Sequence, residues 1–510
     1  MPSTVLNPLA PPRKPTTIPP HQLDYVLRKV FHKPSFRPHQ REIILAALAS
    51  TDLLILAATS FGKSLCYQLP AILHHGITLV ISPLLALMAN QVSALHSAGI
   101  AVASLNSTTP LAERRRILDD LKSGHPIIRL LYVTPETCVQ DGFRKIIRVV
   151  HAQHELARVA VDEAHCISEW GHDFRPAYKQ LGWFKRELHD PEVPVMCVTA
   201  TATERVVGDI VRMMGLEEGR LRTFRCGAAR GNLHFEVRYK SDEGDEMGRD
   251  PFEGLVGWIK GMQRRKRKME EAGLLKLKGK PTTATSTTGL TAAPSATRSH
   301  SPISGIIYTL SRTSCELLAT ALTAAGIPSK PFHAGLPAPT KSLTLTAWAA
   351  SSPGYDVVVA TTAFGMGIDK HDVRFVAHWC LPKSFEGYYQ EAGRAGRDGR
   401  AASCVLWYGR EDRDRVVGFR EGEGERRTAA WGRAESLRAL VGWAEGVGKC
   451  RHVGIQDYFG NGEVGRCGFA CDVCKDGEGV RKRMERGLAS EEWCSTQREM
   501  GVYESGEEYY

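Results

Sequence analysis

The sequence has no apolar run that could cross a membrane. A spanning helix needs about 18 consecutive apolar residues, whereas the apolar stretch at 53–58 has six. Residues 1–20 are rich in Pro and Thr and lack the apolar segment of a secretion signal. We therefore expect an intracellular protein without membrane contact. Its first 20 residues are expected to form a disordered tail.

The sequence also lacks an internal repeat and the features of a disulfide-stapled domain. Its 13 cysteines belong to a chain expected in a reducing compartment, where disulfides are rare. Nine are scattered, mostly in apolar segments, and are expected to be small apolar side chains. The other four gather near the C-terminal end and require a separate explanation.

Charge of one sign is only moderately in excess, with a formal net charge of +10. This balance fits a polyanionic partner such as nucleic acid, although a surface with spare lysines gives the same value. The length of 510 residues suggests roughly three domains, and a hydrophobic content of 43% can fill ordinary cores.

Short β-rich runs alternate with helical patterns in two blocks, at about 21–225 and 303–410. This alternation is typical of parallel α/β sheets. The expected strands are 53–58, 78–82, 130–134, 159–161, 195–199, 305–310, 356–360 and 374–378.

The two blocks are separated by a change in composition. Residues 263–280 are strongly basic, with Arg-Arg-Lys-Arg-Lys at 264–268, and 281–301 are mostly Thr, Ser, Ala, Pro and Gly. The second part is expected to be disordered. The basic run is a candidate nuclear-localisation signal or nucleic-acid patch; alternatively, it is the polar end of a helix that begins near Pro251.

The first expected strand runs directly into Thr-Ser-Phe-Gly-Lys-Ser at 59–64, and a helical pattern follows. A strand, a tight loop and a helix form a phosphate-binding arrangement, because backbone N–H groups and the helix N-terminus face the anion. Lys63 is expected to reach the β- and γ-phosphates and Ser64 to ligate Mg²⁺. Gly-Lys-Ser alone is a weak signal and also occurs in ordinary loops.

Two carboxylates, Asp162 and Glu163, follow a later apolar run. One acid beside a phosphate loop can hold Mg²⁺, and the next can order the attacking water. Upstream, Gln40 before a helix can read an adenine edge, although it also suits a solvated helix start. The small hydroxyl residues at 199–202 suit a hydrogen-bond relay between two sites.

Aromatic and cationic residues follow the carboxylates closely. Trp170, Phe174 and Arg175 form a cluster suited to stacking on unpaired bases. In the second block, residues 389–399 are dense in Arg and Gly, which suits a cleft that faces phosphate. An exposed basic turn is the alternative. The glycine-rich strand end at 360–369 is expected at the same cleft or against a nucleic-acid phosphate.

The clustered cysteines have the spacing C-x16-C-x3-C-x2-C. Four thiolates in a reducing compartment suit tetrahedral Zn²⁺ in a closed structural site. Unliganded structural cysteines are the alternative, and His452 could compete as a ligand. The expected zinc ligands are Cys450, Cys467, Cys471 and Cys474.

Together these motifs resemble the RecQ family of DNA helicases, within the superfamily 2 motors. The resemblance covers about residues 21–475. The matching motifs are FRPHQ, GKSLCYQLPA, SPLLALMANQV, DEAHCISEWGHDFRPAY, TATAT, FHAGL, TTAFGMGIDKHDVRFVAH and YYQEAGRAGRDG. Of these, CISEWGHDFRPAY is the most specific, because it resembles the aromatic-rich loop that couples DNA binding to ATP hydrolysis in that family.

The resemblance implies an α/β fold of two RecA-like parallel-sheet lobes followed by a small helical zinc-binding subdomain. The implied division is a disordered tail 1–20, an ATP-binding lobe 21–225, a second lobe 226–410 with a basic, disordered insertion 263–301, a zinc-binding subdomain 411–475 and a polar tail 476–510.

The resemblance also assigns roles to individual residues. The implied ATP contacts are Arg37, Gln40, Thr59, Gly62, Lys63, Ser64 and Gln390. The implied catalytic residues are Lys63, Asp162, Glu163, Arg394 and Arg397, with Arg397 as arginine finger. The implied Mg²⁺ ligands are Ser64 and Asp162, and the implied contacts to single-stranded DNA are Trp170, Phe174 and Arg175.

The chain departs from the family pattern at several positions. Ser60 and Phe61 replace common glycines of the phosphate loop, Lys33 stands where some members have an aromatic residue, and Asn90 replaces a common Asp. The linker is longer than usual. The 36 residues after Cys474 are too few for the winged-helix domain of longer members.

The function expected from these observations is ATP-dependent 3′–5′ translocation on single-stranded DNA and duplex unwinding, in DNA repair, recombination or replication. The expected cofactors are ATP, Mg²⁺ and Zn²⁺, the expected partners are single-stranded and forked or tailed DNA, and the expected location is the nucleus. One alternative is a DNA-binding or strand-annealing factor with little or no ATPase activity. An RNA helicase is another, since DEAH alone also fits that class.

Overall fold

The computed structural model describes residues 19–170, 174–228, 230–241, 250–273, 303–365, 370–413, 416, 427–460, 465–468 and 470–504. The N-terminal tail expected at 1–20 lies almost wholly outside the described residues, as do Gly171–Asp173 of the aromatic-rich segment and Met366–Asp369 of the glycine-rich strand end. Among the described residues, no helix combines the length and apolar character needed to cross a bilayer.

The first lobe contains a seven-stranded parallel sheet with the order β3-β4-β2-β5-β6-β1-β7. Its central strands are apolar along their whole length because helices cover both faces. In β1, Leu54 and Leu56 face one apolar layer, whereas Leu53 and Ile55 face the other. The strands are β1 Asp52–Ala57, β2 Ile77–Ile81, β3 Val102–Leu105, β4 Leu130–Val133, β5 Leu156–Asp162, β6 Val195–Thr199 and β7 Leu221–Cys226.

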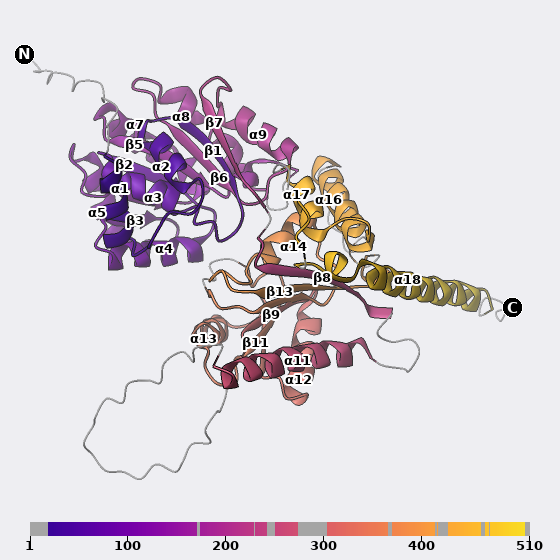
Figure 1. Ribbon diagram of the computed structural model, residues 1–510. Helices are drawn as coiled ribbons and strands as arrows, with labels where there is room; N and C mark the ends of the chain where they lie inside the picture. The colour runs from indigo at the N-terminus through magenta and orange to yellow at the C-terminus, as the bar shows by residue number, and fades with distance from the viewer. Residues whose placement is uncertain are drawn as a thin grey trace, which may run out of the picture.

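Helices surround this sheet and connect its strands (Figure 1). Their bounds are α1 Pro20–Lys29, α2 Gln40–Leu48, α3 Leu65–Leu73, α4 Leu85–Ser97, α5 Leu111–Lys122, α6 Pro135–Cys138, α7 Asp141–Ala152, the 3₁₀ helices η1 Ala164–Ile167 and η2 Pro176–Gln180, α8 Trp183–Glu187 and α9 Glu204–Met214.

The second lobe contains a six-stranded parallel sheet with the order β10-β11-β9-β12-β13-β8. The strands are β8 Leu233–Tyr239, β9 Gly305–Tyr308, β10 Ser329–Phe332, β11 Val357–Ala360, β12 Phe375–His378 and β13 Ala402–Tyr408. The remaining helices are α11 Pro251–Glu271, α12 Arg312–Ala324, α13 Ala338–Ala349, α14 Phe385–Ala392, α16 Arg427–Glu445, α17 Arg451–Tyr458 and α18 Asp472–Glu504.

The cysteine-bearing C-terminal region shares its apolar core with the second lobe. Helices α11 and α12 cover one face of the second sheet. The other face is covered by α13 and α14 together with Leu437 and Leu440 of α16 and Ile455 of α17. A backbone hydrogen bond of 3.2 Å from Phe235 N to Ala470 O joins the C-terminal region to the edge strand β8.

All eight predicted strands are present, with ends that differ by up to three residues. Five strands were missed: β3, β7, β8, β10 and β13. The edge strands β7 and β8 show why, because only one residue of β7 is fully buried and β8 is buried at alternate positions. Such strands lack the continuous apolar run that identifies a central parallel strand.

The expected disordered insertion at 263–301 is wrong for its first part. Residues 263–271 continue helix α11, and 274–302 lie outside the described residues. The helix begins at Pro251 after the N-cap Asp250, whose side chain accepts a hydrogen bond from Phe252 N. Leu255 and Ile259 anchor it on the second sheet. The basic run is therefore the polar end of a helix.

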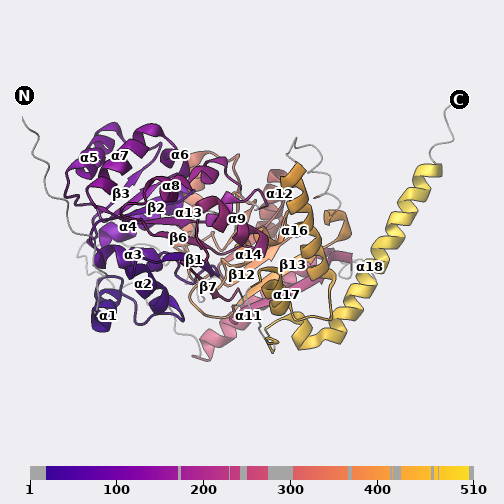
Figure 2. The same cartoon turned by 90° about the horizontal axis from the view of Figure 1, so that it is seen from above.

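The polar tail at 476–510 continues as α18 through Glu504. The helix is interrupted at Asp476, where φ is −155° and ψ is 65°. Figures 1 and 2 show α18 projecting from the body of the molecule beyond the second lobe. The part of α18 that packs on the protein lies against β8 and the C-terminal core.

Candidate functional site

A cavity of about 1120 Å³ opens between the two lobes. Parallel strands carry their binding sites at their carboxyl ends, and both sheets contribute such ends here. The cavity brings together every residue predicted to bind ATP or take part in its hydrolysis. These residues are Arg37, Gln40, Thr59, Gly62, Lys63, Ser64, Asp162, Glu163, Gln390, Arg394 and Arg397.

The loop between β1 and α3 has the shape expected of a phosphate site. Ser60 has a φ of 68° and Gly62 a φ of 86°. Ser60 thus occupies a left-handed conformation that costs an L-residue about 1 kcal/mol, which explains why glycine suits this position. Lys63 Nζ donates to the carbonyl oxygens of Ala57 at 3.1 Å and Ala58 at 3.4 Å, so it lies folded back over the loop.

Gln40 ties the predicted adenine motif to this loop. Its Oε1 accepts from Arg37 N at 2.8 Å and its Nε2 donates to Phe61 O at 2.8 Å. A Cβ added at Gly62 would lie 2.7 Å from Gln40 Nε2, so a glycine is needed for this close approach. Gln40 therefore positions the phosphate loop, a role that the sequence did not indicate.

Four charged residues set the electrostatics of the site. Burial lowers the pKa of Lys63, whereas Glu163 and Asp162 raise it and Arg397 lowers it. Burial and the neighbouring charge of Glu163 raise the pKa of Asp162 to about 7, against the opposing effect of Lys63. Arg397 of the second lobe lines the same cavity as the phosphate loop of the first.

A chain of close polar contacts leads from Glu163 to the end of β6. Glu163, in a left-handed conformation with φ 49°, lies 3.4 Å from Nδ1 of His165 through its Oε2. The same His165 nitrogen lies 2.9 Å from Thr199 Oγ1, which also accepts from Thr201 N at 3.3 Å. Of the two hydroxyls at 199–202, that of Thr199 is placed for a relay, whereas the buried Thr201 Oγ1 has no hydrogen-bond partner in the described part of the chain. His165 is a contact that sequence reasoning missed.

The Arg-Gly segment of the second lobe is held by residues that carried no sequence signal. Arg230 Nη1 donates to Gly393 O and Ala395 O, each at 2.9 Å, and Arg230 Nη2 donates to Gly396 O at 2.5 Å. Asn232 Nδ2 donates to Gly396 O at 2.9 Å. These bonds join positions more than 160 residues apart, so no local motif could reveal them.

The two lobes touch directly at this segment. Thr59 Oγ1 of the phosphate loop donates to Gly393 O at 3.2 Å. A Cβ at Gly393 would lie only 2.0 Å from Thr59 Oγ1, so glycine is required for the contact. The phosphate loop and the arginine segment are therefore already adjacent in this structure.

The two predicted catalytic arginines have different surroundings. Arg394 is 6% exposed and lies beside Tyr308, which stacks on His378 at 5.3 Å. His378 Nε2 lies 2.9 Å from Glu391 Oε2, and this buried pair connects α14 to β12. Arg394 is thus embedded in the second lobe, whereas the charge of Arg397 acts across the cavity on Lys63.

The three predicted DNA contacts have separate partners and do not line the cavity. The Arg205 guanidinium lies 3.0 Å from the centroid of the Trp170 ring. Phe174 lies under Lys179 Nζ at 5.1 Å. Arg175 Nη1 is 4.0 Å from Glu136 Oε1. The connecting residues Gly171–Asp173 lie outside the described residues.

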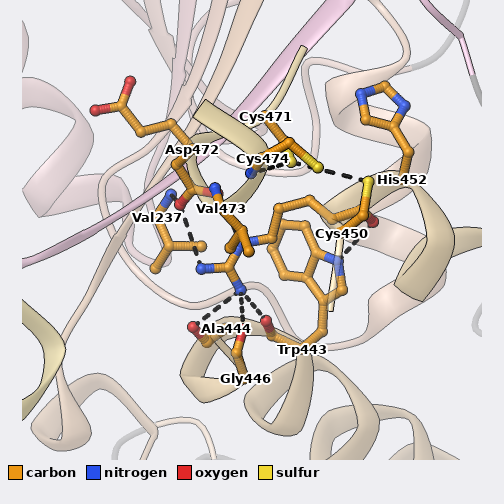
Figure 3. Close-up of polar contacts among 12 residues, drawn as sticks. Val237, Trp443, Ala444, Gly446, Cys450, His452, Cys471, Asp472, Val473 and Cys474 are labelled. Carbon is orange, nitrogen blue, oxygen red and sulfur yellow. Dashed lines mark hydrogen bonds and ion pairs between the residues drawn. The ribbon is translucent and has the colours of Figure 1, made fainter. Parts of the chain in front are cut away.

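The four predicted zinc ligands converge in the C-terminal region. The sulfur atoms of Cys450, Cys467, Cys471 and Cys474 all lie within 4.8 Å of one another, and part of this cluster is visible in Figure 3. Burial raises the pKa of Cys450, but hydrogen bonds, chiefly from the backbone of Val453 and Cys467, lower it to about 7. Four converging thiols fit Zn²⁺.

His452 is not part of this cluster. Its Nε2 lies 3.1 Å from Ala470 O, and its ring packs edge-on against Phe235 at 5.0 Å. The four cysteines therefore converge without His452, and the structure gives no support to the alternative of a histidine ligand.

Arg451 and Asp472 form a buried ion pair, and Figure 3 shows Asp472 close to Cys471 and Cys474 of the cysteine cluster. Arg451 Nε donates to Asp472 Oδ1 at 3.0 Å, and Arg451 Nη2 donates to Asp472 Oδ2 at 3.2 Å. Arg451 Nη1 also donates to the carbonyl oxygens of Trp443, Ala444 and Gly446. Because Arg451 follows Cys450 and Asp472 follows Cys471, the pair fixes two ligands relative to each other.

Three family models match the chain in the order of the lobes. The DEAD/DEAH box helicase model matches residues 37–210 and the helicase conserved C-terminal domain model matches 290–399. The RecQ zinc-binding model matches 410–475, which includes all four clustered cysteines. The chain belongs to the RecQ family of DNA helicases.

This RecQ chain is 37% identical over 479 residues to "ATP-dependent DNA helicase Q5" of Rattus norvegicus, covering 92% of the chain and 45% of that relative. It is also 37% identical over 459 residues to "ATP-dependent DNA helicase hus2/rqh1" of Schizosaccharomyces pombe, covering 88% and 30%. The RecQ chain thus spans less than half the length of these two relatives.

The solved structure of the DUF1998 helicase MrfA bound to DNA and AMPPNP shares the fold. It is 16% identical and covers 80% of this RecQ chain and 54% of its own chain, with a TM-score of 0.57. The likeness agrees with the two parallel-sheet lobes expected from the sequence.

Proposed function

We propose that this RecQ chain hydrolyses ATP between its lobes and uses the energy to move 3′ to 5′ along single-stranded DNA and separate duplexes. The observation that carries the proposal is the cavity shared by Lys63, Asp162 and Arg397. A phosphoryl-transfer site needs a phosphate cradle, an acid and a cation from the opposing domain, and these three residues supply them.

Each side chain then has a defined task. Lys63 leaves the carbonyl oxygens of Ala57 and Ala58 and binds the phosphates instead. Ser64 and Asp162 are oxygen donors that fit Mg²⁺, which supplies charge neutralisation on the phosphates when bound. Glu163 orders the attacking water, and Arg397 stabilises the charge that develops during transfer.

A conformational change caused by ATP hydrolysis has to be transmitted from the nucleotide cavity to the residues assigned to DNA. The chain from Glu163 through His165 to Thr199 connects the carboxylates with the end of β6. The aromatic-rich segment begins immediately after η1, which carries His165. We assign Trp170, Phe174 and Arg175 to single-stranded DNA, and forked or tailed duplexes as the substrates to be unwound.

The remaining assignments concern zinc and location. Four converging thiols and the RecQ zinc-binding match support Zn²⁺ as a structural ion. Eukaryotic relatives named DNA helicases support work on nuclear DNA. The exposed Arg264, Arg267 and Lys268 on α11 are candidates for an import signal or a nucleic-acid contact.

The test is ATP turnover with and without single-stranded DNA, followed by unwinding of forked and tailed duplexes. Lys63→Ala is expected to lower DNA-stimulated turnover at least about 100-fold, because it removes a preorganised donor to the phosphates. Lys29→Ala, which alters an exposed lysine on α1, is the matched control and should retain full turnover.

The competing functions predict different results. A strand-annealing factor without ATPase activity would anneal DNA equally well with and without the Lys63→Ala substitution, and would show no turnover to lose. An RNA helicase would be stimulated more by RNA than by DNA oligomers of the same length. Unchanged turnover in Lys63→Ala contradicts the motor assignment.

A further inference from the structure

Trp170 does not stand free for a base to stack on, although we assign it to DNA. The Arg205 guanidinium of α9 lies 3.0 Å from the centroid of its ring. A planar cation at that distance covers a face of the indole, which is the surface that stacking on a base requires. In this structure Arg205 therefore occupies the place of a base.

Trp170 also rests on the C-terminal region. A Cβ added at Gly432 of α16 would lie 2.8 Å from Trp170 Cε3 and 3.2 Å from Trp170 Cα. Such a short distance cannot be tolerated without movement, so only the bare backbone of a glycine leaves room for Trp170 here. We name Arg205 and Gly432 the tryptophan seat.

The seat belongs to a wider contact between α9 and the zinc-binding region. Arg225 Nη1 donates to Gly460 O at 3.1 Å and to Glu204 Oε1 at 2.6 Å. A Cβ at Gly460 would lie 2.4 Å from Glu204 Oε1. A second glycine backbone therefore lies against the same end of α9.

The seated segment is connected to the hydrolysis site. Trp170 N donates to Ser168 Oγ at 3.2 Å, and Ser168 Oγ donates to Asp209 Oδ2 of α9 at 2.6 Å. Ser168 follows η1 directly, so Trp170 is hydrogen-bonded to the residue that ends the helix carrying His165. The position of Trp170 is thus coupled to the carboxylates through three short steps.

From these contacts we propose that Arg205 and Gly432 are positioning residues that hold Trp170 in a seated, DNA-free position, with Arg205 as the placeholder for a base. Single-stranded DNA competes with the seat for the indole. The apparent affinity for DNA is then reduced by the fraction of molecules that are seated. This inference rests on the proposed DNA-stimulated ATPase activity. It adds that the contacts of Arg205 and Gly432 with Trp170 set the DNA concentration needed to stimulate ATP turnover.

The test is the concentration of an oligo-dT strand that gives half-maximal stimulation of ATP turnover. In Gly432→Ala the new methyl group displaces Trp170, and the half-activating concentration is expected to fall about two- to fivefold, the range of one exposed cation–π contact. The maximal rate should stay within about twofold, because no group of the catalytic cavity changes.

The matched control is Gly442→Ala on the same helix, where an added Cβ meets no atom within 4 Å. Both variants gain helix propensity, so only the tryptophan seat distinguishes them. The difference in fluorescence emission between each protein and its Trp170→Phe derivative reports on Trp170 alone. DNA should shift this difference spectrum in the original chain, and Gly432→Ala should show the shift before DNA is added.

The possible results test the tryptophan seat, the role of Arg205 and the proposed function separately. An unchanged or higher half-activating concentration in Gly432→Ala overturns the inference. Arg205→Gln should also lower that concentration; a higher value would mean that Arg205 itself binds DNA and would overturn its placeholder role. If the unaltered chain shows no DNA-stimulated ATP turnover at all, the proposed function fails instead, and there is no half-activating DNA concentration for the tryptophan seat to influence.

Discussion

Replacing Arg451 by Met should severely destabilise the cysteine-bearing region. Arg451 and Asp472 are 1% and 5% exposed at their side chains, so neither charge is hydrated. Met has a similar length and removes the guanidinium while keeping much of the apolar stem. The change leaves the Asp472 carboxylate buried without its partner and withdraws a donor from the carbonyl oxygens of Ala444 and Gly446.

The magnitude follows from this loss. Breaking a buried ion pair by removing one partner costs about 3–5 kcal/mol, because an uncompensated charge remains inside. Asp472 keeps the hydrogen bond that Oδ2 accepts from Val237 N at 2.9 Å, which places the expected cost near the lower end, at about 3 kcal/mol. The ligands Cys450 and Cys471 adjoin the pair, so zinc retention should decline as well.

A suitable assay follows zinc release to a coloured chelator as urea is increased, since a chain of several domains does not unfold in one step. Lys482→Met is the control, because it breaks an ion pair to Glu478 whose side chains are 69% and 71% exposed. Its expected cost is below about 0.5 kcal/mol. Adding Asp472→Asn to Arg451→Met should recover part of the stability by removing the stranded charge. A cost of Arg451→Met below about 1 kcal/mol, or no recovery, refutes the reasoning.

Two further predictions concern the nucleotide cavity. Arg230→Gln removes the donors that hold the 393–396 carbonyls, so Arg397 should lose its position and kcat should fall by about 10–100-fold; a steady-state assay that shows a change in KM alone contradicts this. In the nucleotide-free chain, folded Asp162 keeps its proton up to a pKa of about 7, whereas its ordinary value is 3.8. The free energy of unfolding should therefore fall by up to about 1.4 kcal/mol per pH unit as pH rises between about 4 and 7, and urea titrations of Asp162→Asn should lack this slope.

The sequence was most informative where function depends on contiguous residues. The phosphate loop and the Asp162–Glu163 pair each lie at the carboxyl end of a strand, where parallel sheets carry their binding sites, and the arginine segment was expected at a phosphate-facing cleft from its Arg and Gly content; all three line one cavity. The central strands were found because both of their faces are buried. The spacing of the four cysteines predicted their convergence, because short intervals restrict how far two of the ligands can separate.

Sequence reasoning failed where a role depends on distant partners. The edge strands β7 and β8 are only partly apolar, and helix α11 extends through Glu271 into the insertion 263–301 that was expected to be disordered. Arg230 and Asn232 gave no signal, because their partners lie more than 160 residues further along the chain.

The sequence by itself determined the family and identified the residues that converge in the cavity and in the cysteine cluster, because each depends on residue types at fixed short spacing. Only the tertiary structure decided that Arg397 acts on Lys63 while Arg394 is embedded in its own lobe. It also decided that Trp170 lies against Arg205 and Gly432. These relations join different elements of the fold, and packing between elements, rather than local propensity, fixes the distances across such contacts.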